Sequence, residues 1–289
     1  MKTWFITGVR TGLGRATAQA ALERGDTVVG IVRTEEAAAD FAKLEPGRAI
    51  GLTADITDRK AVFAAVDDAE RATGGIDIVM NNAANQLESW IEEADPDEIR
   101  RILESNIMGA VHVTQAFLPY LRKRGKGHFL NMSSMGGAVG WPWVGFYTMT
   151  KFAIEGLSES LQQEVGSFGI NVSIIEAGGF RTALFTREHV LTTSRIPEYD
   201  QAPVAQVRAR IRGRGGKEDG DPKKFAQVML KVVDAENPPQ RIAVGADAIE
   251  IVLAKAKRLT EQIEAWRDVC SNLDLEPDAL IPYVPVAGA

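Results

Sequence analysis

Tyr147 and Lys151 stand four residues apart in a stretch with a helical pattern, 146–166. Residues at i and i+4 share a helix face, so the phenol and the ammonium group would point the same way. A nearby cation favours the phenolate and lowers the pKa of a tyrosine from its reference value of about 10. Such a pair can serve as a general acid or base near neutral pH. Taken alone, the spacing is also typical of an exposed helix surface.

Three glycines lie in the turn between the first apolar run and the helical pattern at 13–24. Gly8 permits a tight turn, Gly12 lets the backbone approach a pyrophosphate, and Gly14 allows close packing of helix and strand. A helix N-terminus also presents N–H groups and a positive dipole to phosphate oxygens. A plain strand-to-helix turn is the alternative interpretation. The predicted cofactor contacts in this turn are Gly8, Arg10, Thr11, Gly12, Leu13 and Gly14.

The end of the second apolar run indicates which dinucleotide binds. An acidic residue there would bind the ribose 2′-hydroxyl of NAD, and positions 32–34 carry none. Arg33 can instead bind a 2′-phosphate through two hydrogen bonds, and Arg10 can face the same group. NADP(H) is therefore favoured over NAD(H), with two surface cations as the alternative.

Apolar runs alternate with amphipathic stretches along the whole chain. This alternation is typical of a parallel sheet with helices on both faces, and right-handed crossovers make such a sheet doubly wound. We predict one α/β domain over residues 1–289, a Rossmann fold with a seven-stranded parallel sheet. The predicted strands are Trp4–Thr7, Thr27–Val32, Ala49–Thr53, Ile76–Asn81, His128–Met132, Asn171–Ile175 and Arg241–Val244, and the predicted helices lie near 13–24, 58–72, 96–123 and 146–166.

The alternation breaks at about 183–220, where prolines and a run of arginines occur. A long irregular segment in a compact domain is usually functional or mobile, so we predict a helical lid over the substrate. A solvated surface insertion is the alternative. A C-terminal extension follows at about 245–289, with a long helix near 246–268 and a proline-spaced tail, 277–285. The one cysteine, Cys270, is interpreted as a small apolar residue of that helix and excludes an intrachain disulfide.

The composition narrows the classes of function. Of the 289 residues, 45% are hydrophobic and 25% are charged, a balance typical of globular proteins. A net charge of −6 with scattered basic residues argues against a nucleic-acid partner. No stretch reaches membrane-spanning length, and the first residues leave no room for a signal peptide. We expect a soluble protein of the reducing cytoplasm, with no membrane partner and no metal site.

Several motifs together resemble the short-chain dehydrogenase/reductase family over most of the chain. Ser134 lies 13 residues before Tyr147, which is the family spacing between the catalytic serine and tyrosine. The other matching residues occur in the family's order: Thr7–Gly14, Asp55, Ile56, Asn81, Asn82, Ala83, Ala84, Asn106, Lys151 and Thr182.

The resemblance implies hydride transfer between NADP(H) and a carbonyl or alcohol carbon. Tyr147 would give its proton to the developing alkoxide, Ser134 would orient that oxygen, and Lys151 would hold the nicotinamide ribose and lower the tyrosine pKa. Asn106 matches an asparagine that organises a proton relay. The further cofactor contacts that the family resemblance implies are Asp55, Ile56, Asn82, Ala83, Ala84, Tyr147, Lys151, Gly178, Phe180 and Thr182.

The chain departs from the family pattern at two places. Ala84 stands where the family has glycine. After the sixth strand the family usually has Pro-Gly, whereas positions 176–179 read Glu-Ala-Gly-Gly. Losing that proline makes the loop less rigid and leaves the positions of Phe180 and Thr182 open.

Three assignments have structural alternatives. Ser133 competes with Ser134, and adjacent strand residues face opposite sides, so only one of them can face the substrate. Asp55 could instead cap or turn the start of the next helix, and Asn106 could pack or cap a helix end.

Aromatic residues between the serine and the tyrosine indicate the kind of substrate. Trp141, Trp143 and Phe146 lie where the family borders its substrate pocket, and Asn85 can add a polar contact. Aromatic side chains offer large apolar surfaces, so we expect a bulky or aromatic ketone or alcohol. Packing of the two tryptophans beneath the lid is equally open.

The resemblance also bears on assembly and on other functions. Helices near 96–123 and 146–166 form the dimer interface in much of the family, so a homodimer or homotetramer is expected. A non-catalytic dinucleotide-sensing protein and an epimerase or lyase on the same fold stay open as alternatives. Retention of both Tyr147 and Lys151 argues against the first of them, and consumption of NADPH by a ketone would exclude the second.

Overall fold

The structure is a computed structural model, and it describes residues 1–185, 190–192, 196–201, 203, 205–271 and 273. The predicted proline-spaced tail, 277–285, lies outside these residues. None of the helices in the described part is long and apolar enough to cross a membrane.

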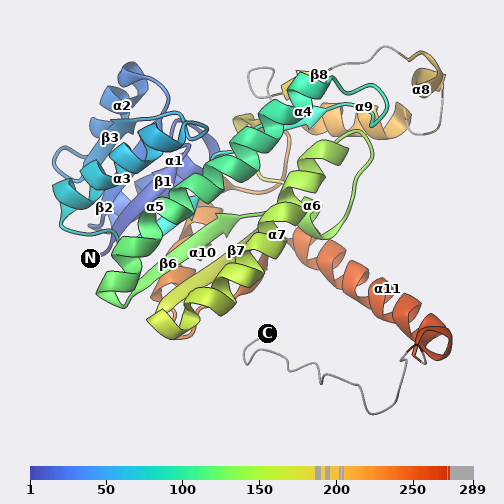
Figure 1. The fold of residues 1–289 in the computed structure, drawn as a ribbon. Coiled ribbons are helices and arrows are strands. Elements are labelled where there is room, and N and C mark those ends of the chain that lie inside the picture. The colour runs from blue at the N-terminus through green and yellow to red at the C-terminus, as the bar shows by residue number, and fades with distance from the viewer. Residues whose placement is uncertain (186–189, 193–195, 202, 204, 272, 274–289) are drawn as a thin grey trace.

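A seven-stranded parallel sheet forms the centre of the molecule, in the order β3-β2-β1-β4-β6-β7-β9 (Figure 1). The strand order reverses between β1 and β4, and open α/β sheets bind ligands beyond the carboxyl ends of the strands at such a point. The predicted fold class is therefore confirmed. The strands are β1 (Thr3–Thr7), β2 (Thr27–Val32), β3 (Ala49–Thr53), β4 (Ile78–Asn81), β6 (Gly127–Met132), β7 (Ile170–Ala177) and β9 (Arg241–Val244).

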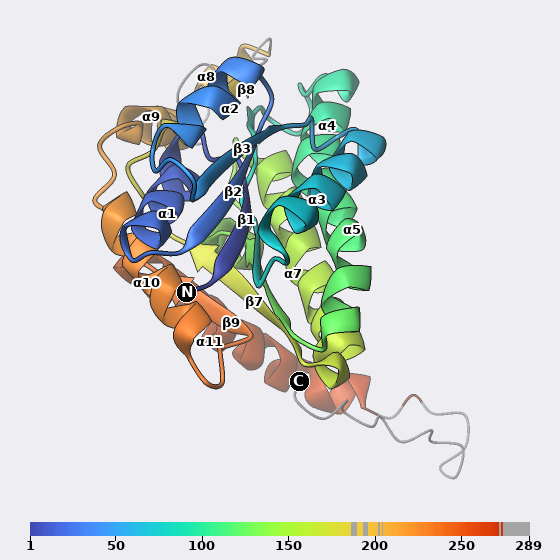
Figure 2. The same cartoon turned by 90° about the vertical axis from the view of Figure 1, so that its left-hand side faces the viewer.

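Helices cover both faces of the sheet, as Figure 2 shows from one side. Successive strand residues face opposite sides, so Trp4 and Ile6 enter one apolar cluster while Phe5 enters the other. The first face carries α1 (Gly12–Glu23), α2 (Glu35–Ala42) and α10 (Pro222–Asp234), and the second carries α3 (Arg59–Thr73), α5 (Gly109–Arg124) and α7 (Gly145–Val165), which ends in the short η2 (Gly166–Phe168).

The helix predicted at 96–123 is confirmed, and it contains a π-helical turn that the sequence did not indicate. It consists of α4 (Pro96–Leu103), the π-helical η1 (Glu104–Met108) and α5. The physical reason lies in Asn106, whose side chain leaves the helix surface to bond the backbone of the segment after β4. Single π-turns inside α-helices are frequent at functional sites.

Two helices, α2 and α10, were not predicted, although both begin with capping residues. The Thr34 side chain accepts a hydrogen bond from the backbone N–H of Ala37, 3.2 Å away. Asp221 accepts from the N–H of Lys223 at 2.8 Å, and Pro222 occupies the first helical position. These are standard start signals of a helix. The apolar spacing of Phe225, Met229 and Val233 in α10 is helical as well.

The irregular segment contains short elements that lie beside α4 at one end of the molecule (Figure 1). They are η3 (Ala183–Phe185), β8 (Val190–Thr192), α8 (Glu198–Gln201) and α9 (Ala205–Arg214). Strand β8 pairs with β5 (Gln86–Glu88) in a separate two-stranded sheet. The last helix, α11 (Ala246–Cys270), projects away from the body.

Candidate active site

The glycine turn after β1 is held by the segment that follows β4. Gly8 and Gly12 have φ of +75° and +67°, the left-handed region that favours glycine. The Asn82 amide donates to the carbonyl oxygens of Thr7 and Gly8 at 2.8 and 3.2 Å. A Cβ on Gly14 would stand 2.4 Å from that amide nitrogen, so glycine is required there. The Asn82 side chain therefore holds the turn, where the sequence analysis predicted a cofactor contact.

The start of α1 has the properties of a dinucleotide phosphate site. Its N-cap, Thr11, makes no side-chain capping bond, and its first turn carries no acidic residue. The first N–H groups and the helix dipole are thus available to an anion. Thr182, on the loop after β7, lies 3.4 Å from the position of a Cβ on Gly12. The structure brings these two predicted contacts together, and the residues present fit a pyrophosphate.

The predicted adenosine end of the site lies at the ends of β2 and β3. Arg33 is exposed at the end of β2, and Glu35 and Glu36 follow it in the first turn of α2. The Asp55 carboxylate accepts hydrogen bonds from the backbone N–H and hydroxyl of Thr57, at 2.9 and 2.8 Å. Asp55 thus makes the turn interaction that the sequence left open as an alternative.

Ser134 and Tyr147 meet at the carboxyl end of β6. Ser134 begins the short helix α6 (Met135–Ala138), and its hydroxyl lies beside the Tyr147 side chain in the first turns of α7, where it acts to lower the tyrosine pKa. Ser133 faces the opposite side, where its hydroxyl donates to the Glu155 carboxylate. The alternation of strand side chains therefore places Ser134, and not Ser133, against the tyrosine.

Lys151 is buried one helix turn beyond Tyr147. Its ammonium group donates to the Met132 carbonyl oxygen at 2.7 Å and lies 5.5 Å from the centre of the Tyr147 ring. Burial lowers the pKa of Lys151 to about 8, against the opposing effect of the Glu155 carboxylate. Burial raises the pKa of Tyr147 to about 12, against the Ser134 hydrogen bond. This shift is opposite in direction to the predicted lowering of the tyrosine pKa, because desolvation outweighs the Ser134 hydrogen bond.

Asn106 connects the segment after β4 to α7. Its carboxamide oxygen accepts from the Asn85 N–H, and its amide donates to the Asn85 carbonyl, both at 2.8 Å. The same amide donates to the Thr150 hydroxyl at 3.2 Å, which donates in turn to the Tyr147 carbonyl at 2.7 Å. Asn106 therefore fixes the backbone at both Asn85 and the start of α7, a packing role that stands beside the predicted relay.

An aromatic cluster lies beside the tyrosine. Trp143 is 1% exposed, with its ring 4.9 Å from that of Trp90, which stacks on Tyr199 at 5.0 Å. The Arg208 guanidinium lies 5.4 Å above the Trp143 ring. Trp143 thus takes the packing position that the sequence left open. Sequence analysis missed Trp90 and Tyr199, since they are 109 residues apart. The half-buried Trp141 and Tyr147 pack against this cluster, and Phe146 is also half-buried.

The loop after β7 is held without the expected proline. The Asp247 carboxylate, in the first turn of α11, accepts from the Gly179 N–H at 2.8 Å. A Cβ on Gly178 would stand 2.1 Å from the same carboxylate, so glycine is required there. The Phe180 ring is buried against Phe225 of α10, at 5.1 Å. Asp247 thus supplies the restraint that the missing proline would have given.

The sequence analysis missed an ionic cluster behind Lys151, in which Glu155 and Glu176 are buried and Arg241 and Glu159 are exposed. The Glu155 carboxylate contacts Ser133 and stands 2.8 Å from the Arg241 guanidinium, which also binds Glu176 at 2.7 Å and Glu159 at 2.6 Å. Burial raises the pKa of Glu155 to about 7, against the Ser133 hydrogen bond and Arg241. The available signal was position: Glu155 lies one turn beyond the lysine on the same helix face.

Comparison with known proteins agrees with this geometry. Residues 2–190 match the family model described as short chain dehydrogenase, and the chain belongs to the short-chain dehydrogenase/reductase family. It is 38% identical to oxidoreductase BOA17 of Botryotinia fuckeliana, over 93% of this chain and 97% of that protein. It is 33% identical to a 3-ketodihydrosphingosine reductase of Bacteroides thetaiotaomicron, over 88% and 91% of the two chains. A short-chain dehydrogenase structure from Streptomyces avermitilis superposes with a TM-score of 0.87 at 34% identity, covering 95% of this chain and all of that one.

Proposed function

We propose that this protein reduces a ketone or aldehyde with NADPH, or oxidises a secondary alcohol in the reverse direction. The observation that carries the proposal is the placement of the Ser134 hydroxyl beside the Tyr147 side chain, with Lys151 buried one turn beyond. Membership of an oxidoreductase family supports the reaction class. We also propose a cytoplasmic setting, since the sequence carries a single cysteine.

The chain's own residues supply the proton and the charge stabilisation. Tyr147 is a neutral phenol at neutral pH because burial raises its pKa to about 12, so it donates its proton to the forming alkoxide. Ser134 hydrogen-bonds the same oxygen, where negative charge develops. Lys151, with a pKa near 8, carries a positive charge below that pH. This charge stabilises the negative charge of the forming alkoxide. A bound nicotinamide supplies the hydride.

The glycine turn and the exposed Arg33 support the choice of cofactor. The free N–H groups at the start of α1 suit the pyrophosphate, and Thr182 lies over Gly12. Arg33 is the group we assign to a 2′-phosphate, because a guanidinium matches phosphate oxygens in pairs.

A bulky hydrophobic carbonyl compound is the substrate class we propose. Trp141, half-buried against the aromatic cluster, offers an apolar surface near Tyr147. The similar Bacteroides protein is named as a reductase of a ketone, 3-ketodihydrosphingosine. We further propose that the segment 183–220 covers this substrate. The stacking of Tyr199 on Trp90, and the Tyr199 hydroxyl bonded to Glu92 at 2.8 Å, support a docked position for it.

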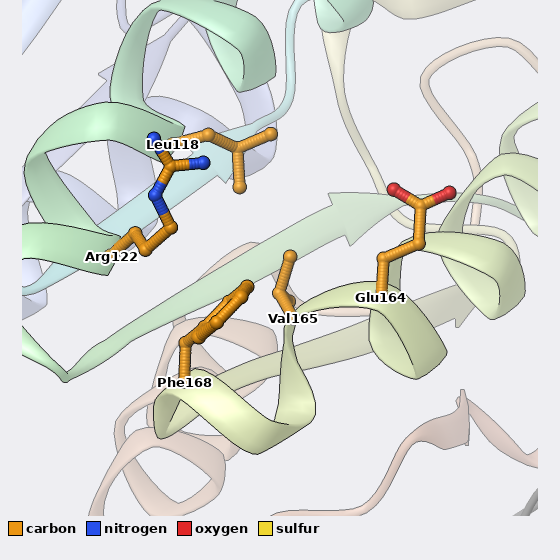
Figure 3. A pocket seen from close by; sticks show the side chains of 5 residues that line it. All are labelled: Leu118, Arg122, Glu164, Val165 and Phe168. Atoms are coloured by element: carbon orange, nitrogen blue, oxygen red, sulfur yellow. The ribbon is translucent and has the colours of Figure 1, made fainter.

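We propose a homodimer through α5 and α7. Met149 and Phe152 are exposed on α7, and a patch of this kind marks interaction surfaces. A shallow pocket of about 200 Å³ lies between the ends of the two helices, where side chains of α5 face those of α7 and η2 (Figure 3). Its lining residues are Leu118, Arg122, Glu164, Val165 and Phe168.

Replacement of the tyrosine hydroxyl tests the proposed reaction. Ketones and alcohols of increasing apolar size would be offered with NADPH and NADH, and turnover followed by absorbance of the reduced nicotinamide. We expect Tyr147→Phe to lower kcat by about 10² to 10⁴, the usual contribution of a positioned acid, with unchanged NADPH binding by calorimetry. Tyr120→Phe is the matched control, because its hydroxyl bonds Asp67 on the surface of α3.

Two outcomes would contradict the proposal. Near wild-type turnover by Tyr147→Phe would remove the tyrosine from the mechanism. A wild-type chain that binds NADPH but oxidises and reduces nothing in the panel would favour a dinucleotide-sensing protein.

A further inference from the structure

The last helix, α11, stands apart from the body of the molecule (Figure 1). It packs against α6 and β9, Asp247 in its first turn holds the loop after β7, and Ala248 is its one buried residue. Every described residue from Ala256 to Leu273 is exposed. A helix of 25 residues is about 37 Å long, and helices of this length without tertiary packing are marginally stable in water.

The exposed part of α11 carries an apolar stripe with a seven-residue repeat. Leu259, Ile263 and Trp266 are 47%, 57% and 63% exposed. Spacings that alternate between four and three residues are typical of a helix that packs against another helix, rather than of a helix on a flat surface. The apolar stripe consists of Val252, Ala256, Leu259, Ile263, Trp266 and Cys270.

Charge is excluded from the apolar stripe and is unevenly distributed along the helix. Glu261, Glu264 and Asp268 follow the opposite side, as 100° per residue requires. The segment 255–258 carries three cations, whereas 261–268 carries three carboxylates and one arginine. The first half of the exposed helix is thus basic and the second half is acidic.

We propose that the apolar stripe of α11 packs against the same stripe of a second copy of this chain, in antiparallel orientation. Antiparallel pairing sets each basic half beside the acidic half of the other helix, whereas parallel pairing sets like charges together. It also places the two bodies at opposite ends of the pair, because each helix is attached to its body at its first residues. A two-fold axis across the helices makes this contact closed and self-complementary.

The order of large and small residues in the apolar stripe sets the register. An antiparallel pair in which Leu259 faces Ile263 of the other helix also sets Ala256 opposite Trp266. The large indole then fills the space above the small methyl group, as close packing requires. In this register the ring of Trp266, more than half exposed in the single chain, becomes buried in the interface.

A charge placed within the apolar stripe tests the contact. The molar mass of the full-length chain would be measured by light scattering after size exclusion. We expect Ile263→Lys to have half the mass of the wild type, because a buried ammonium disfavours the interface. Ala265→Lys is the matched control, since this exposed residue lies on the other side of the helix, and it should keep the wild-type mass. Far-UV circular dichroism checks that each variant is folded.

The register has its own test. Ala256→Trp puts two large rings into one layer and should shift the assembly toward smaller species, whereas Ala265→Trp should not. Equal masses for the wild type and Ile263→Lys would overturn the proposal. A larger mass after deletion of residues 274–289 would also overturn it. That result would indicate that the chain's own C-terminal residues occupy the apolar stripe. The chain would also be sedimented with vesicles of phosphatidylcholine and phosphatidylglycerol. If the wild type sediments with them, Ile263→Lys does not, and the two proteins have the same mass, the stripe binds a lipid surface instead.

Discussion

At the scale of the residue, Tyr147 and Lys151 share one environment that changes both pKa values. Burial favours the neutral form of each group, so it raises the tyrosine pKa to about 12 and lowers the lysine pKa to about 8. At neutral pH the phenol therefore holds its proton and the lysine is still charged. This combination suits proton donation to a carbonyl oxygen, the direction of reduction that we propose.

Arg33 determines the cofactor preference in our proposal. Arg33→Asp removes a guanidinium from the 2′-phosphate and adds a carboxylate that binds a 2′-hydroxyl. A charge-assisted hydrogen bond contributes about 1.5 to 3 kcal/mol, so the ratio of kcat/KM for NADPH over NADH should fall at least about tenfold. Arg71→Asp, on the exposed last turn of α3, is the control and should leave that ratio unchanged. An unaltered preference in Arg33→Asp would exclude Arg33 from the phosphate site.

At the scale of the element, β6 joins the core to the active site. The start of the strand carries His128, whose Nε2 lies 2.9 Å from the Ser173 hydroxyl of β7. Asn131, near its end, donates to the Ser158 hydroxyl of α7 at 2.8 Å. Ser134 follows directly and meets Tyr147. Strand pairing and these polar contacts therefore fix the position of α7, and with it Tyr147, relative to Ser134.

His128 makes the stability of β6 dependent on pH. Burial, with a smaller contribution from the charge of Lys2, lowers its pKa from 6.5 to about 4. The unfolded chain then binds the proton more readily, so this contribution to the free energy of unfolding is complete above pH 6.5 and is lost as pH falls toward 4. The loss should reach about 3 kcal/mol, at 1.36 kcal/mol per pKa unit.

Urea unfolding of the wild type and of His128→Gln, at pH 7 and pH 4.5, measures this effect. The glutamine variant stays neutral, so it should be less stable at pH 7 and should lose less stability on acidification. The same loss in both proteins would show that His128 is not the titrating group.

At the scale of the whole molecule, two surfaces carry exposed apolar side chains on separate helices. One is the α5 and α7 face with Met149 and Phe152, and the other is the apolar stripe of α11. Two such contacts would close into an assembly of four chains if their two-fold axes cross at right angles. The glycine turn belongs to neither surface, so such an assembly need not cover it.

Combining variants separates the two interfaces. Phe152→Glu places a charge on the α7 face and should halve the wild-type mass, because a carboxylate there would have to be desolvated. Together with Ile263→Lys it should produce a monomer, since the two contacts act independently. Lys60→Glu, on the exposed start of α3, is the control and should keep the full assembly. A double variant heavier than one chain would contradict independent interfaces.

Local spacing in the sequence was sufficient to predict much of the molecule. The glycine turn, the helix that carries Tyr147 and Lys151, the single strands and the long last helix all depend on contacts between near neighbours. Apolar periodicity and glycine positions report such contacts directly. The same reasoning missed α2 and α10, whose starts depend on single capping residues.

Tertiary structure decided what local spacing leaves open. The alternation of side chains between the two faces of the sheet placed Ser134, and not Ser133, beside the tyrosine. Burial reversed the expected shift of the Tyr147 pKa. Trp143 packs with Trp90 and Arg208, and Tyr199 stacks on Trp90, although all three lie far from Trp143 in the sequence. The partners of Glu155 likewise come from other strands. The sequence by itself determined which chemical groups this protein carries and at what spacing. Their protonation and their neighbours depend on desolvation and on long-range packing, which exist only once the chain is folded.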